Sequence, residues 1–74
     1  MLARCYVDRK HGRTRLDIHY SVHMGRLRID RLIAMGPGSA EHNIDYTFLN
    51  DSAQNTVQKA VEIDFEDRLY REYY

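Results

Sequence analysis

The sequence predicts a small α+β domain, in which an antiparallel meander of three to four strands packs against one long C-terminal helix. Two patterns carry this prediction. Up to about residue 49, apolar and polar residues alternate in several segments of the 74-residue chain, as in strands with one buried and one solvated face. From Ala53 onward, apolar residues recur every four positions, which is a helical spacing. The length corresponds to a single domain over residues 1–74.

The first two predicted strands form a hairpin. Residues 2–8 alternate small apolar side chains with larger ones, and residues 14–23 give the clearest period of two in the chain. The polar loop Lys10–Arg13 contains a glycine and separates the two segments. Met24-Gly25 then marks a second tight connection.

Residues 26–35 are compatible with two structures. They begin with the same alternation and end in four consecutive apolar residues. A bulge near Asp30-Arg31 would let one strand accommodate both patterns, whereas a short helix would stop at Gly36-Pro37. We favour the strand, because it completes a meander. After the Gly36–Ser39 turn, alternation predicts a further strand over residues 43–49.

The C-terminal segment predicts a helix over most of residues 52–72. Asn50-Asp51-Ser52 supplies capping side chains, and Asp51 with Gln54 resembles a capping box. The four-residue spacing of the apolar stripe drifts by about 40° per step, so the stripe wraps around the helix and its last turns are free for a second surface. The alternative is a short helix followed by a strand over about 60–66, because Val61–Glu66 alternates perfectly.

The predicted core comprises the apolar residues on the inner faces of these elements: Leu16, Ile18, Tyr20, Val22, Leu27, Ile29, Ile44, Tyr46, Phe48, Val57, Val61 and Phe65.

Basic and acidic residues are separated along the chain, although the formal net charge is zero. Residues 1–35 carry eight basic and three acidic side chains, and residues 36–74 carry three basic and eight acidic ones, so the two halves have net charges of +5 and −5. Two interpretations are open. Either the halves neutralise each other inside the fold, or one face stays charged and meets a partner of opposite charge.

The side chains that catalysis or metal binding requires do not gather in this sequence. Cys5, the one cysteine, lies on the apolar face of a predicted strand, where we expect a buried and unreactive thiol. His19 and His23 are four residues apart on a strand, about 13 Å, which is too far to share one ion. Only one residue separates the glycines of Gly36–Ser39, so this segment is no phosphate loop. We expect no enzyme activity, metal or cofactor.

The first functional hypothesis is a non-enzymatic protein that docks on a larger protein or protein–nucleic-acid complex and inhibits it. Tyrosine is enriched at interface hot spots, and a carboxylate surface can occupy a basic groove as nucleic acid would. The residues expected to bind the partner are Glu62, Glu66, Asp67, Tyr70, Tyr73 and Tyr74. The tyrosine-rich end is also a candidate homodimer contact. In size and make-up only, the chain resembles small phage or mobile-element inhibitors such as anti-CRISPR proteins, which implies a viral protein in the host cytoplasm.

The alternative hypothesis is a module that binds RNA or DNA through an arginine-rich sheet face. Tyr6 lies nearby for stacking on a base. The arginines expected to bind nucleic acid are Arg13, Arg15, Arg26, Arg28 and Arg31. No stretch reaches the roughly 18 apolar residues of a membrane span, and no secretory signal is recognisable, so the expected compartment is the cytoplasm.

Overall fold

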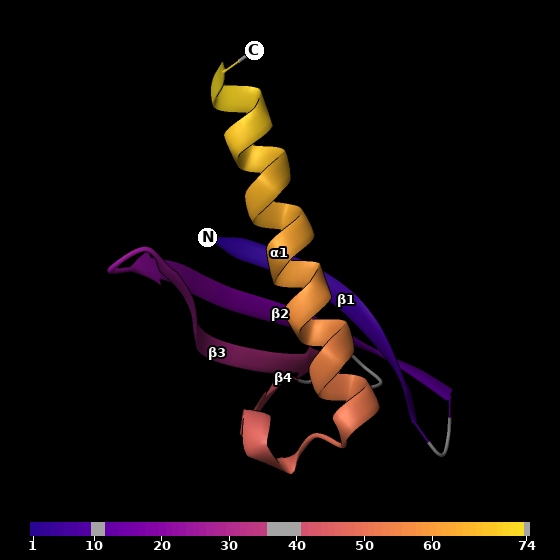
Figure 1. The fold of residues 1–74 in the computed structure, drawn as a ribbon. Helices are drawn as coiled ribbons and strands as arrows, with labels where there is room; N and C mark the ends of the chain where they lie inside the picture. Colours follow the sequence, from indigo (N-terminus) through magenta and orange to yellow (C-terminus); the bar gives the residue numbers. More distant parts are fainter. Residues whose placement is uncertain (10–11, 36–40, 74) are drawn as a thin grey trace.

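The computed structural model describes residues 1–9, 12–35 and 41–73, without the side chains of Arg9 and Tyr73. Its elements confirm the predicted α+β fold (Figure 1). In chain order they are β1 (Leu2–Arg9), β2 (Gly12–His23), β3 (Arg26–Met35), β4 (Glu41–Ile44), a 3-10 turn (Tyr46–Phe48) and α1 (Asp51–Tyr73).

The four strands form one antiparallel sheet in the order β1-β2-β3-β4, as expected for a meander. Ile18 pairs with Ala3 on one side and with Leu32 on the other. The register shifts after His19, which pairs with Arg31, because Tyr20 pairs with Ile29 and leaves Asp30 as the extra residue. The strand interpretation of residues 26–35 and the predicted bulge are therefore confirmed.

A tight turn joins β2 to β3. Met24 and Gly25 have φ angles of 52° and 76°, and two left-handed residues in succession are typical of the type I′ hairpin turn. The predicted loop Lys10–Arg13 is shorter than expected, because Gly12 and Arg13 already belong to β2. Lys10, His11 and the predicted turn Gly36–Ser39 lie outside the described residues.

The predicted strand over residues 43–49 is wrong beyond Ile44. The side chain of Asp45 accepts hydrogen bonds from the Thr47 backbone nitrogen at 3.0 Å and from Thr47 Oγ1 at 2.8 Å. This local bonding competes with a sheet ladder and turns the chain into the 3-10 segment. Phe48 is consequently 85% exposed rather than part of the core.

α1 confirms the predicted helix and excludes a strand over residues 60–66. The capping residue is Asn50 and not Asp51, because Asn50 Oδ1 accepts from the Ala53 backbone nitrogen at 2.8 Å. Gln54 does not complete a capping box. Its side-chain nitrogen instead donates to the carbonyl oxygens of Tyr46, at 3.3 Å, and Leu49, at 3.1 Å.

The core lies between α1 and the face of the sheet that the helix crosses (Figure 1). Among the predicted core residues, the structure buries Leu16, Ile18, Tyr20, Val57 and Val61, and packs Leu27, Ile29, Ile44, Tyr46 and Phe65 against them in part. Burial also includes residues outside that prediction: Ala3, Cys5, Val7, Leu32 and Ala34. Val22 was predicted in the core but is exposed, at the hairpin end of β2.

Candidate binding surfaces

The ion pairs of the described residues stay within the two halves of the chain. Arg4 and Arg15 contact Asp17, and two further pairs join residues of the basic half: Arg13 with Asp8 and Arg28 with Asp30. On α1, Arg68 contacts Asp64 at 2.7 Å and Arg71 contacts Asp67 at 3.0 Å. None of these six pairs connects the basic half to the acidic half, so ion pairing does not neutralise one half with the other.

The helix-free face of the sheet collects the arginines of the basic half. Side chains alternate between the two faces of a strand, and the residues paired across β1, β2 and β3 share a face. Tyr6, Arg15 and Met35 thus form one row on the side opposite the core. We call this side the open sheet face, and its arginines are Arg4, Arg13, Arg15, Arg26, Arg28 and Arg31.

The arginines of the open sheet face do not form one compact patch. Arg28 pairs with Ser21, six residues along β2 from Arg15, which corresponds to about 20 Å. Aspartates also pair with several of them. Among the described residues, only Arg26 and Arg31 of this face have no carboxylate partner, and Arg31 Nη2 donates to Asn43 Oδ1 at 3.1 Å.

The centre of the open sheet face is partly dehydrated although no helix covers it. The Asp17 side chain is only 15% exposed, with Arg4 Nε at 3.0 Å and Arg15 Nε at 3.4 Å. Ile33 pairs with Asp17 across the ladder and is 8% exposed.

The residues predicted to bind a protein partner lie along the outer part of α1. Glu62, Glu66 and Asp67 are exposed, and Tyr70 is 65% exposed. The last turns of α1 extend past β1 and beyond the sheet (Figure 1). Tyr73 belongs to the helix by its backbone, whereas its side chain and the whole of Tyr74 lie outside the described residues. The structure therefore places four of the six predicted residues on one exposed helical segment.

A polar cluster fastens this segment to the sheet. Tyr20 Oη donates a hydrogen bond to Asp64 Oδ2, which also accepts from Arg68 Nε at 2.7 Å. Arg68 Nη2 donates to the carbonyl oxygen of Leu2 at 3.1 Å. We refer to Tyr20, Asp64, Arg68 and Leu2 as the Tyr20–Asp64 clasp.

The clasp shifts the pKa of each of its three ionisable side chains, and its hydrogen bond to Asp64 raises the pKa of Arg68. Burial, together with the hydrogen bond to Asp64 and its negative charge, raises the pKa of Tyr20 to about 12. Burial alone would raise the pKa of Asp64, but the hydrogen bonds from Tyr20 and Arg68 outweigh it and lower that pKa. The sequence analysis followed only the apolar stripe of the helix and did not predict the clasp. The clasp could have been suspected from the positions of Asp64 and Arg68, which lie seven and eleven residues after Val57 and therefore on the sheet-facing side of the helix.

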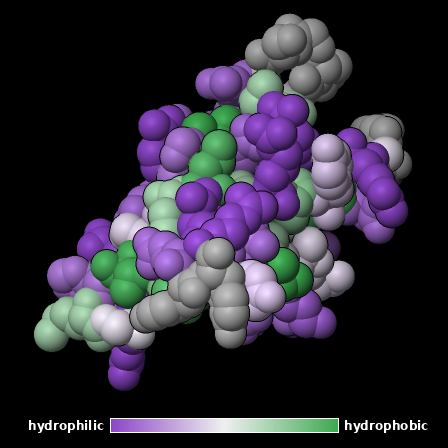
Figure 2. All heavy atoms as spheres, turned by 90° about the horizontal axis from the view of Figure 1, so that it is seen from above, coloured by the Kyte–Doolittle hydropathy of each residue, from purple (hydrophilic) through white to green (hydrophobic). Residues whose placement is uncertain are grey.

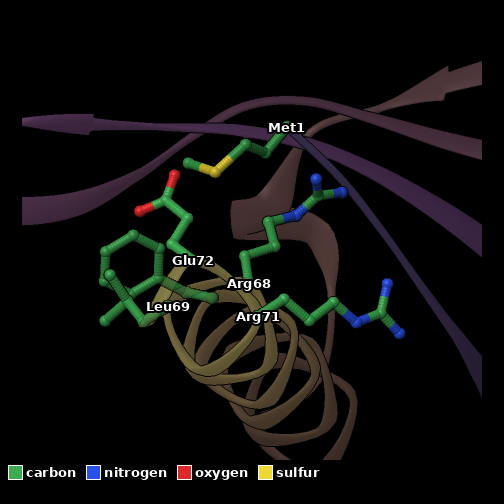
Figure 3. A pocket seen from close by; sticks show the side chains of 6 residues that line it. Met1, Arg68, Leu69, Arg71 and Glu72 are labelled. Carbon is green, nitrogen blue, oxygen red and sulfur yellow. The ribbon is translucent and has the colours of Figure 1, made fainter. Parts of the chain in front are cut away.

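A hollow of about 400 Å³ lies beside the clasp. Met1, Phe65 and Leu69 supply apolar surface, and the charged side chains of Arg68, Arg71 and Glu72 surround it (Figure 3). Seen from the side of the helix C-terminus, apolar surface forms separate patches between hydrophilic residues (Figure 2). The hollow is large enough to accept a side chain of another molecule, because ligand pockets begin at about 300 Å³.

The described residues were also compared with the requirements of a metal site and of a membrane span. In residues 1–9, 12–35 and 41–73, no three His, Cys, Asp or Glu side chains are placed to hold a metal ion. None of the helices in the described part of the chain is able to span a bilayer. Cys5 is buried, and burial raises the pKa of its thiol. Comparisons with protein-family models, curated protein sequences and solved structures found no match.

Proposed function

We propose that the protein is a non-enzymatic binding protein, which docks on a larger protein through the exposed end of α1. The observation that carries this proposal is the hollow at a helix end that extends past the sheet. We define the helix-end surface as the hollow, which Leu69 lines, together with four exposed residues of the same half of α1: Glu62, Glu66, Asp67 and Tyr70.

The chemistry of the helix-end surface indicates the kind of partner that fits it. Interfaces concentrate their binding energy in a few aromatic or apolar anchors that enter a pocket, surrounded by a polar rim. Here the hollow offers the pocket, with Arg68, Arg71 and Glu72 around it, and Glu62 and Glu66 are exposed on the same helix outside the hollow. A partner surface that fits has one protruding apolar side chain with a carboxylate beside it for the arginines, and lysines or arginines opposite Glu62 and Glu66. Docking of this acidic segment in the nucleic-acid groove of a host complex would make the protein an inhibitor, as in small phage inhibitors, and would place it in the host cytoplasm.

Affinity capture with matched variants tests the proposal. Wild-type protein, Leu69→Asp and the double variant Glu62→Lys/Glu66→Lys are immobilised and exposed to a host lysate, with Asn55→Lys as the control on the exposed side of the first helical turns. We expect a protein that wild type and Asn55→Lys retain and that both helix-end variants lose. Equal retention by all four would refute this surface as the docking site.

A second candidate function is nucleic-acid binding by the open sheet face. The observation in its favour is that Arg26 and Arg31 have no carboxylate partner in the described part of the chain, on a face that also presents Tyr6 at 58% exposure. Binding of labelled RNA or DNA should then weaken steeply with salt. The double variant Arg26→Glu/Arg31→Glu should lose it, while Lys59→Glu on α1 should not. Binding that is absent at low salt, or unchanged in the arginine variant, rejects this function.

A further inference from the structure

We infer that β1 is a self-complementary edge strand at which a second copy of the chain pairs. β1 has eight residues, and among residues 1–9, 12–35 and 41–73 it pairs only with β2, so one of its two edges has no neighbouring strand there. An uncovered edge presents backbone N–H and C=O groups to another chain. The strand at the opposite edge of the described sheet, β4, has four residues, so β1 offers twice the length.

The hydrogen-bond pattern shows which residues of β1 face this edge. Tyr20 N donates to Met1 O at 2.9 Å and Met1 N donates to Tyr20 O at 2.8 Å, so these two residues form a hydrogen-bonded pair. In an antiparallel ladder such pairs alternate. Odd-numbered residues of β1 therefore bond to β2, and even-numbered residues direct their backbone groups outward.

The clasp limits the available part of the edge. Leu2, the first even-numbered residue, uses its outward carbonyl oxygen to accept from Arg68. This bond agrees with the alternation and leaves Arg4, Tyr6 and Asp8 as the outward-facing residues of β1. Their side chains lie on the open sheet face, and in order they are positive, aromatic and negative.

This order is complementary to itself when reversed. A two-fold axis through Tyr6 pairs Arg4 with Asp8 of the second copy, Asp8 with Arg4 of the second copy, and the two Tyr6 residues with each other. Opposite charges directly across a ladder stabilise it. Within each chain Arg4 contacts Asp17 and Asp8 contacts Arg13. The pairing of β1 with β1 of the second copy, which we call the joint, therefore continues a row of alternating charges from one sheet into the next.

The helix borders the outer edge of β1 and presents an apolar side chain on that side. A hollow of about 260 Å³ separates Thr56 from Tyr6 and Asp8, so the Thr56 side of α1 borders the outer edge of β1. Ile63 follows Thr56 by seven residues and therefore lies on the same side of the helix. Ile63 is 67% exposed. Pairing at β1 brings the second copy to this side, where the exposed isoleucine gains cover.

Charge variants that are complementary to each other test the register. Arg4→Asp places two negative pairs across the joint, and Asp8→Arg places two positive pairs there. We expect sedimentation analysis to show a dimer for wild type and monomers for each variant alone. An equimolar mixture of the two variants should form a heterodimer, because every pair across the joint is then of opposite charge. Arg28→Asp, on the same face but away from β1, is the control and should remain a dimer. Circular dichroism verifies that each variant is folded.

Cross-linking provides a second measurement that does not depend on charge. Across a hydrogen-bonded pair the Cα atoms are about 5.5 Å apart, within the range of a disulfide. Tyr6→Cys should thus form a covalent dimer on oxidation, whereas Arg4→Cys, whose counterpart lies about 13 Å away along the strand, should not. A monomeric wild type at high concentration overturns the inference. So does a dimer that survives both charge variants, and dissociation by Leu69→Asp would then assign it to the helix-end surface.

Discussion

The two ends of α1 are attached to the sheet by different kinds of interaction. In the first half, Val57 and Val61 are almost fully buried against β1 and β2. In the second half, Phe65 packs against the core only in part, and hydrogen bonds connect Asp64 and Arg68 with Tyr20 and Leu2. Apolar burial is non-directional, whereas the clasp fixes atoms of three elements at defined positions. The first half therefore supplies stability and the second half supplies orientation for the helix-end surface.

The largest effect is expected from a charge in the first half. Val57→Asp places a carboxylate in the core with no partner, which costs more than the roughly 3–5 kcal/mol that a domain of this size has available. We expect the variant to be unfolded by circular dichroism at 25 °C. Asn55→Asp is exposed on the same turn and should change the free energy of unfolding by less than about 0.5 kcal/mol. A folded Val57→Asp variant would contradict the assigned core.

A smaller effect is expected from removing one hydroxyl from the clasp. Tyr20→Phe deletes the hydrogen bond to an ionised carboxylate, and bonds to charged groups contribute about 1.5–3 kcal/mol. We expect urea unfolding to show a loss of about 2 kcal/mol. The matched control is Tyr46→Phe, whose hydroxyl accepts from Gln58 at 3.1 Å in an exposed position, with a loss of about 0.5 kcal/mol. Equal losses in the two variants would mean that the clasp contributes no more than a surface hydrogen bond.

The clasp should also make stability depend on pH in two windows. The pKa of Tyr20 rises from its ordinary value near 10 to about 12 on folding, so its contribution is complete below pH 10 and is lost as the pH rises toward 12. The pKa of Asp64 is lowered on folding, so its contribution is complete above pH 4 and is lost as the pH falls below that value. The stability difference between wild type and Tyr20→Phe should therefore shrink at both extremes. A difference that is constant from pH 3 to 12 is the contrary outcome.

The smallest effect is expected at the far end of α1. Arg71→Gln breaks an exposed pair with Asp67, four residues away on the helix, and such pairs contribute about 0.3–0.5 kcal/mol. Arg68→Gln breaks a pair of the same spacing but also the bond to Leu2, so we expect a larger loss of stability. Thermal unfolding of both variants measures the difference. If Arg71→Gln costs more, the projecting end is held by contacts other than the clasp.

The sequence predicted those strands and that helix in which the spacing of apolar residues follows one buried face. Leu16, Ile18 and Tyr20 alternate because β2 buries one of its two faces under α1, and Val57 and Val61 recur at helical spacing because α1 buries one side against the sheet. The pattern failed where a local hydrogen bond outweighed it. Asp45 bonds to Thr47 and ends β4, although Ile44, Tyr46 and Phe48 alternate perfectly. Asn50 and Asp51 both carry capping side chains, and adjacent candidates cannot be separated by pattern.

The candidate surfaces were predictable only in part. Arg13, Arg15 and Arg28 were correctly expected to share a face, because alternation fixes faces. The distance between Arg28 and the pair Arg13 and Arg15 depends on the register of β2 with β3, and the alternation of apolar residues does not determine that register. The bond between Tyr20 and Asp64 joins residues 44 positions apart. No local pattern reports such a contact, and only the direction in which the helix crosses the sheet brings the two together.

The confinement of the ion pairs to the two halves gives the molecule a permanent electric dipole. Strands β1 to β3 hold the excess of arginine and α1 holds an excess of carboxylates, on opposite sides of the core. A molecule of zero net charge with such a dipole is oriented by external fields. It turns its sheet toward a polyanion and its helix toward a polycation before any contact is made. Its solubility near neutral pH should accordingly increase when salt is added, because salt screens the head-to-tail attraction between dipoles.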